Sequence, residues 1–164
     1  MEVFKKIPED LDAFSGDLVV AVVGEDERPL QAANAWLDWR VYGGLTELIT
    51  RGLFSGKLGE KCLVPTYTKF KFDRLVLIGG GPLFEEAVYP TDDSGQARWL
   101  SIADSIYQTI RTLNVKKLGL SLPRFDLVDQ EKALIKAFQM SRLPNDTTLF
   151  MARAAHYSST QMSV

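Results

Sequence analysis

The 164-residue sequence contains only one cysteine and one histidine, which excludes an internal disulfide and a Cys/His metal site. Cys62 alone forms no internal disulfide, and with only His156 beside it there is no Cys/His cluster for structural zinc. No apolar run reaches the ~18 residues of a membrane span, and the N-terminus lacks the apolar middle of a signal peptide. We therefore expect a cytoplasmic protein without a metal or other cofactor, in which Cys62 is a small core residue.

The sequence also has little excess charge, since 19 Lys and Arg face 21 Asp and Glu for a net charge of −2. This balance argues against a nucleic-acid module, which neutralises phosphates with a basic surface, and it gives no attraction to anionic membranes. The alternating TKFKFDR, residues 68–74, is interpreted as a half-exposed strand. Apolar residues make up 46% of the chain, so we expect one domain over residues 1–164, with a polar tail at 153–164.

Strand and helix patterns alternate along the chain. Apolar runs predict strands at 17–23, 62–64, 75–78, 116–122 and 147–153, with a short edge strand at 2–7. Helical spacing predicts a helix from Pro29, a second after Gly43–Gly44, a long one over 94–113 and one capped by Asp129. The long helix has N-cap candidates at Asp92, Asp93 and Ser94 and an apolar stripe of Trp99, Leu100, Ala103, Ile106, Tyr107, Ile110 and Leu113. The alternation indicates an α/β layer fold with a mixed or parallel sheet.

Two glycine-rich stretches raise the question of a nucleotide site. RLVLIGGGP, residues 74–82, places three glycines after a strand, but Phe84 takes the third glycine position of a dinucleotide fingerprint. GLFSGK, residues 52–57, has three residues between its glycines where a P-loop has four, and Leu58 stands where Ser or Thr would hold magnesium. We interpret Gly79–Gly81 as a close turn leaving the sheet, with a ligand loop as the alternative.

Residues suited to catalysis are scarce. No G-x-S-x-G surrounds Ser121, and the acidic pairs Glu85–Glu86 and Asp92–Asp93 are explained by solvation and helix capping. A hydrolase that uses Ser121 or an acidic residue is the weakest of three hypotheses for this chain.

Two stretches, taken together, resemble a known family: AANAWLDWRVYGGLTELI at residues 32–49 and GKLGEKCLVPTYTKFKFDRLVLIGGGP at 56–82. A helix ending in a glycine turn, a second helix, a G-x-x-G-E turn and two strands follow one another. This order resembles the N-terminal domain of the leucyl aminopeptidase family over roughly residues 15–153. Because that domain resembles the macro domain, the resemblance implies a three-layer α/β/α macro-domain-like fold around a central mixed sheet.

The resemblance also implies where the family's peptidase chemistry lies. Its two metal ions, held by aspartates, a glutamate and a lysine, belong to a C-terminal domain that would only be starting at Val164. No catalytic or metal-binding residue is therefore carried over to this chain, and we expect no enzyme activity. The first hypothesis is a non-catalytic module that acts by self-association, as a homo-oligomer, or by docking a protein partner. Trp36, Trp39 and Tyr42 near one helix end suit an interface, with core packing as the alternative for the tryptophans.

The second hypothesis is a macro-type binder of ADP-ribose or another small nucleotide. Its candidate ligand-binding residues are Gly43, Gly44, Gly79, Gly80, Gly81 and Arg124, near the strand ends where such sheets bind ligands. Macro domains have an Asn-Ala-Ala-Asn signature after their first strand and a glycine-rich diphosphate loop after a later one. This chain has Val23–Gly24–Glu25 at the first place and the glycine-free loop Leu122–Asp126 at the second. Because side chains keep a diphosphate away from backbone N–H groups, we expect ADP-ribose to bind weakly or not at all.

Overall fold

The computed structural model describes residues 3–84, 93–125 and 128–152, and six strands in them form one sheet. The strands are β1 (Val3–Lys6), β2 (Leu18–Val23), β3 (Lys61–Val64), β4 (Leu75–Gly79), β5 (Lys117–Ser121) and β6 (Asp146–Phe150). Their order across the sheet is β1-β6-β5-β2-β4-β3. The sheet is mixed, because β3 runs antiparallel to β4 while the other neighbours are parallel.

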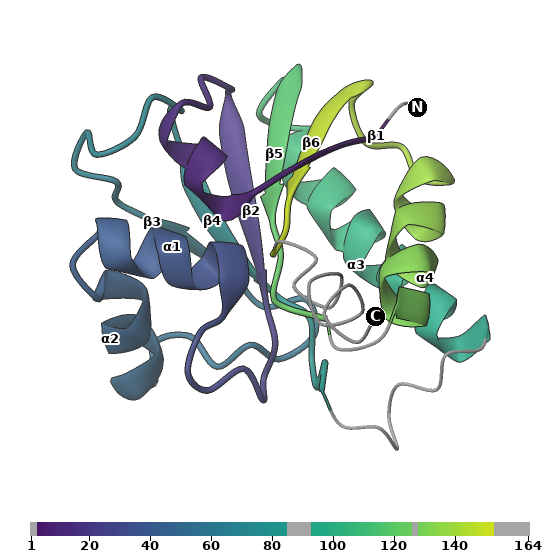
Figure 1. The fold of residues 1–164 in the computed structure, drawn as a ribbon, viewed down its shortest axis with the longest axis horizontal. Coiled ribbons are helices and arrows are strands. Elements are labelled where there is room, and N and C mark those ends of the chain that lie inside the picture. The colour runs from purple at the N-terminus through teal and green to yellow at the C-terminus, as the bar shows by residue number, and fades with distance from the viewer. Residues whose placement is uncertain (1–2, 85–92, 126–127, 153–164) are drawn as a thin grey trace, which may run out of the picture.

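Helices cover both faces of the sheet (Figure 1). The 3-10 helix η1 (Pro8–Asp12), α1 (Ala32–Arg40) and α2 (Gly44–Thr50) lie on one face, and α3 (Asp93–Ile110) and α4 (Val128–Gln139) on the other. Strand β2 contributes Val20 and Val22 to the core beneath α3 and α4, and Val19 and Ala21 to the core beneath α1. Burial on both faces explains its unbroken apolar sequence. The expected three-layer fold with a mixed sheet is confirmed.

The stripe predicted for the long helix is the buried side of α3. Trp99, Ala103, Ile106 and Ile110 are buried against the sheet and α4. The Trp99 ring lies edge-on to Phe138, with 6.0 Å between the ring centroids. The helix ends at Ile110 rather than 113, and residues 111–114 form a turn.

Four sequence predictions about local structure need correction. α1 begins at Ala32, so Pro29 lies in the loop before the helix and not in its first turn. Asp129 is the second residue of α4 rather than its cap, and β6 ends at Phe150. Residues 68–74 are not a strand but turns and bends, in which stacked Phe70 and Phe72 are buried and their neighbours are exposed. Asp92, Glu85–Glu86 and His156 lie outside the described residues.

Candidate functional site

A chain of buried polar side chains lies where β2 and β5 end. Glu27, Asn34 and Ser121 are each fully buried. The Nδ2 of Asn34 donates to the Val22 carbonyl at 2.8 Å and to both carboxylate oxygens of Glu27 at 3.1 Å. Its Oδ1 accepts a hydrogen bond of 2.7 Å from the Ser121 hydroxyl. One amide thus joins α1 to two strands and to the loop after β2.

Glu27 holds the loop between β2 and α1 in place. Its carboxylate accepts hydrogen bonds from the backbone N–H of Gly24 at 3.2 Å and of Gln31 at 2.9 Å. Burial raises the pKa of Glu27 to about 7, against the lowering effect of these two bonds and the one from Asn34. The Arg28 guanidinium donates to the carbonyls of Gly24, Glu27 and Ser55 rather than to the carboxylate.

Sequence reasoning missed this buried network. No role was predicted for Glu27 or Asn34, and Ser121 was considered only as a possible catalytic residue. The signal was the helical spacing, because Asn34 lies beside buried Ala33 and one turn before buried Leu37.

The three glycines at the end of β4, of which Gly79 is its last residue, allow close contact between the chain there and neighbouring loops. Their N–H groups donate to protein carbonyls: Gly79 to Glu60 at 2.8 Å, Gly80 to Val23 at 2.9 Å and Gly81 to Gly56 at 2.9 Å. A Cβ added at Gly79 would lie 1.9 Å from the carbonyl oxygen of Lys57. An anion bound at this turn would therefore have to displace existing backbone hydrogen bonds.

Carboxylates occupy the loops around this turn. Asp26 accepts hydrogen bonds from the backbone N–H of Leu83 at 2.8 Å and of Phe84 at 2.9 Å. Glu60 accepts them from the N–H of Ser55 at 2.6 Å and of Gly56 at 2.9 Å. Together with Glu27, these side chains already accept hydrogen bonds from backbone N–H groups of the loops, so these donors are not free to bind an anion.

The remaining candidate residues lie in other surroundings. Gly43 and Gly44 precede and begin α2, and their N–H groups donate to the carbonyls of Asp38 and Val41. The carboxylate of Asp38 accepts the next two N–H groups, those of Leu45 and Thr46, at 2.9 and 3.0 Å. Arg124 is an exposed residue of the loop after β5. The residues thus belong to three different parts of the fold, and ligand binding by them stays a prediction.

The face covered by α1 and α2 presents a second candidate site, rich in exposed aromatic residues. Trp39 is 64% exposed, Tyr42 82% and Tyr67 72%. Trp36 is half-buried, and its ring centroid lies 5.0 Å from that of Trp39. We call Trp36, Trp39, Tyr42 and Tyr67 the α1–α2 surface. Core packing, the alternative for the two tryptophans, therefore applies in part to Trp36 and not to Trp39.

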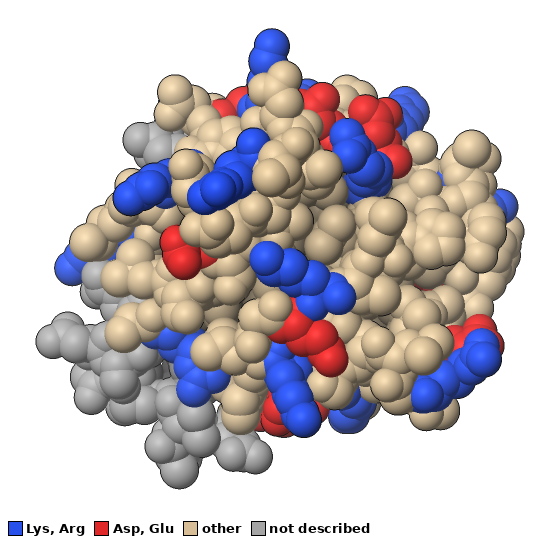
Figure 2. Space-filling view, turned by 180° about the vertical axis from the view of Figure 1, so that it is seen from behind, with Lys and Arg blue, Asp and Glu red and all other residues tan. Residues whose placement is uncertain are grey.

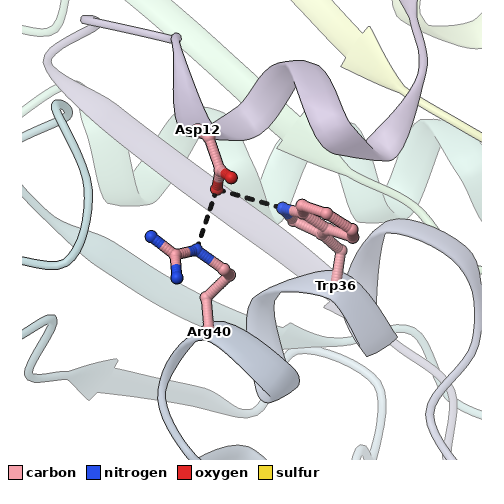
Figure 3. Close-up of polar contacts among 3 residues, drawn as sticks. All are labelled: Asp12, Trp36 and Arg40. Atoms are coloured by element: carbon pink, nitrogen blue, oxygen red, sulfur yellow. Dashed lines mark hydrogen bonds and ion pairs between the residues drawn. The ribbon is translucent and has the colours of Figure 1, made fainter.

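Asp12 of helix η1 binds two partly buried side chains of α1 (Figure 3). The Nε1–H of Trp36 and the Nε–H of Arg40 both donate to Oδ1 of Asp12 at 3.1 Å. The guanidinium of Arg40 also lies 5.8 Å from the ring centroid of Trp39. These contacts restrict the rotamers of α1 side chains, so less conformational entropy would be lost if a partner bound them.

Three hollows follow the α1–α2 surface. The first, of about 540 Å³, lies between η1 and α1 and is lined by Pro8, Glu9, Ala32, Ala35, Trp36, Trp39 and Ala152. The second, of about 450 Å³, is lined by residues from Pro29 to Thr46, and Trp39 and Ala35 form walls of both. The third, of about 320 Å³, lies between α2 and Tyr67. Trp39 therefore stands as a ridge between two depressions.

Unusual backbone angles occur at the tyrosines of this surface. Tyr42, Tyr67 and Thr68 have φ values of 57°, 50° and 58°, which non-glycine residues rarely adopt. The Lys69 ammonium donates a 3.0 Å hydrogen bond to the Tyr42 hydroxyl, which lowers the pKa of that phenol. Residues in such conformations are often found at binding sites, which makes this surface a candidate for one.

Other kinds of site find less support in the described part of the chain. The Ser121 hydroxyl is buried and bonded to Asn34, so no substrate reaches it in this conformation. No three His, Cys, Asp or Glu side chains of the described residues are grouped to hold a metal ion, and none of the helices described is long and apolar enough to span a membrane. On the face in Figure 2, basic and acidic side chains are interspersed, without one continuous basic field.

Comparison with known proteins gives relatives of two kinds. A curated relative, a probable cytosol aminopeptidase from Thermosynechococcus vestitus, is 31% identical over 119 residues, which is 71% of this chain and 22% of that protein. The chain thus spans about a fifth of the length of this relative. Tomato leucine aminopeptidase shares the fold with a TM-score of 0.52 and 14% identity, over 93% of this chain and 32% of that one.

Macro domains are the second kind. The Oceanobacillus iheyensis macrodomain, solved with ADP, has a TM-score of 0.61 and 9% identity, over 93% of this chain and 85% of that one. At this identity the likeness shows the fold alone, and it confirms the macro-domain-like architecture. The model of the cytosol aminopeptidase family, N-terminal domain, matches residues 19–141, which is three quarters of the sequence. The chain therefore belongs to the cytosol aminopeptidase family, through that family's N-terminal domain.

Proposed function

We propose that this chain is a non-catalytic interaction module, which acts by self-association or by docking another protein. The observation that carries the proposal is the α1–α2 surface, where Trp39 and Tyr42 are mostly exposed beside apolar hollows. Tryptophan and tyrosine are enriched at protein interfaces, and an exposed apolar patch of this kind usually marks a binding site. Only the N-terminal domain of the aminopeptidase family is matched, which agrees with a role other than peptide hydrolysis.

Sedimentation velocity of the wild-type chain, from about 1 μM to about 200 μM, tests the first form of this proposal. A sedimentation coefficient that rises with concentration is the expected result. Calorimetric titration with ADP and ADP-ribose runs beside it as the competing measurement. A chain that stays monomeric and binds either nucleotide below ~10 μM would reverse the order of the two functions.

Nucleotide binding is the second candidate, because a macro domain of similar fold was solved with ADP. Against it stand the three engaged glycine N–H groups and the carboxylates of Asp26 and Glu60 in the neighbouring loops. Arg124 is exposed and could approach a phosphate. A hydrolase that uses Ser121 ranks last, because that hydroxyl is buried. A cytoplasmic location stays a prediction.

A further inference from the structure

We propose that two copies of this chain pack their α1–α2 surfaces together across a two-fold axis, with α1 antiparallel to α1 and Trp39 of each copy seated in the hollow beside Ala32 and Ala35 of the other. This inference rests on the proposed function and names its partner, a second copy of the chain. It depends on the size, shape and charge of the described residues of α1.

The exposed aromatic area agrees with a dimer of ordinary size. Aromatic side chains offer about 150–250 Å² each, so the exposed fractions of Trp39, Tyr42 and Tyr67 together present roughly 400 Å². A standard interface buries about 800 Å² per partner. The aromatic residues would thus supply about half of the area that a stable dimer needs, and the walls of the hollows would supply the rest.

The shape of α1 is self-complementary. Small Ala32 and Ala35 lie toward its N-terminal end and line the 540 Å³ hollow, and large Trp39 follows Ala35 by one turn on the same side. In an antiparallel pair, the C-terminal end of one helix lies opposite the N-terminal end of the other. Both copies then place a large side chain against small ones at the same time, as a two-fold interface requires.

The charged residues near the two ends of α1 also favour an antiparallel pair. Arg40 lies at the C-terminal end of α1, beside Trp39, and Glu9 lines the hollow near the N-terminal end. An antiparallel arrangement brings the Arg40–Asp12 ion pair of one copy, with 3.1 Å between Nε and Oδ1, toward the hollow of the other copy, twice. The antiparallel orientation also keeps the two Arg40 side chains apart, whereas a parallel one would bring them together.

Two opposite substitutions test the arrangement. Trp39→Ala removes the inserted side chain, and Ala35→Leu fills the hollow that receives it. Each variant alone is expected to raise the dimer dissociation constant by at least about 30-fold in sedimentation velocity, as for central interface residues. Both positions are at least partly exposed, so both variants should fold, which a far-ultraviolet circular dichroism spectrum like that of the wild type would show.

An equimolar mixture of the two variants tests the two-fold symmetry. In the mixed dimer, the intact Trp39 of the Ala35→Leu chain enters the open hollow of the Trp39→Ala chain, and the added leucine lies where the missing indole was. The mixture should therefore associate at least about 5-fold more tightly than either variant alone. Leu63→Ala is the control, since Leu63 is 67% exposed on β3, outside the α1–α2 surface, and should leave association unchanged.

The outcomes separate this inference from the proposed function. If the wild type associates but Trp39→Ala does not weaken it, the surface is wrong and self-association stands. If both variants weaken association and their mixture recovers nothing, the contact is not reciprocal and the two-fold dimer is wrong. A wild-type chain that remains monomeric over the whole range overturns the dimer, and the interaction module then stands only as one that docks a different protein.

Discussion

Replacing Glu27 by glutamine is expected to remove a pH dependence from the stability of this protein. The carboxylate is fully buried, and its pKa is raised from an ordinary 4.5 to about 7, chiefly by loss of solvation. A raised pKa means that the folded chain binds this proton more tightly than the unfolded chain does. Stability is therefore greatest at low pH and falls as the pH rises from about 4.5 to about 7, with no further change above that.

The size of the effect follows from the shift. Each pKa unit corresponds to about 1.36 kcal/mol, so the wild type should lose roughly 2–3 kcal/mol of unfolding free energy between about pH 5 and about pH 8. Asp17 and Glu60 have lowered pKa values, so their effects fall at more acidic pH, below this window. Any contribution from His156 is common to wild type and variant and cancels in their difference.

Urea unfolding at four pH values between about 5 and 8 provides the measurement. The Glu27→Gln chain should carry a fixed penalty, because its amide faces N–H donors, but its stability should be nearly flat across the range. Glu47→Gln is the matched control, since that side chain is 67% exposed and should leave the wild-type slope intact. A wild-type stability that is flat or rising with pH, or a glutamine variant with the wild-type slope, would refute the reasoning.

Three further predictions concern the core, catalysis and ligand binding. Ile106→Ala removes a fully buried side chain of α3 and should cost about 2–5 kcal/mol in urea unfolding, and a loss below ~0.5 kcal/mol would contradict the assignment of the buried face. Leucyl-anilide substrates with added zinc, manganese or cobalt should not be hydrolysed. Turnover that co-purifies with the chain and disappears in a point variant would refute this expectation. ADP-ribose should bind in calorimetry at about millimolar or weaker, because N–H donors of the glycine turn are already engaged, and a dissociation constant below ~10 μM that Arg124→Ala weakens would establish a working site.

The sequence predicted structure best where burial determines the pattern of apolar residues along a strand or helix. The unbroken LVVAVV of β2 and the stripe of α3 were read correctly because both record which faces are covered. The same rule misled at residues 68–74, where alternation of Phe70 and Phe72 with charged neighbours suggested a strand. Turns and bends place these two phenylalanines inward without any strand pairing, and a period of two does not distinguish the cases.

The candidate sites were harder to predict, because their properties depend on which groups already have partners. In the sequence, the glycines at the end of β4 look alike whether their N–H groups face a ligand or a neighbouring loop. Only the contacts of Gly79, Gly80 and Gly81 with three separate carbonyls tell these apart. The side chains beside Trp39 are likewise held from a distant part of the sequence, because Asp12 accepts hydrogen bonds from Trp36 and Arg40.

Among the surfaces described, the strand-end loops and the sheet edges are less suited to binding a partner than the exposed side chains of the α1–α2 surface. In the loops at the strand ends, the carboxylates and the N–H donors that a ligand would meet are already hydrogen-bonded to protein groups. The two sheet edges could in principle add a strand from a partner, but β1 and β3 have only four residues each. They also carry exposed lysines, Lys5 and Lys6 on one and Lys61 on the other, which is how natural sheets discourage edge pairing. A partner that binds this chain must therefore recognise shape and aromatic area more than backbone, and on the described residues these are concentrated at Trp39 and the hollows beside it.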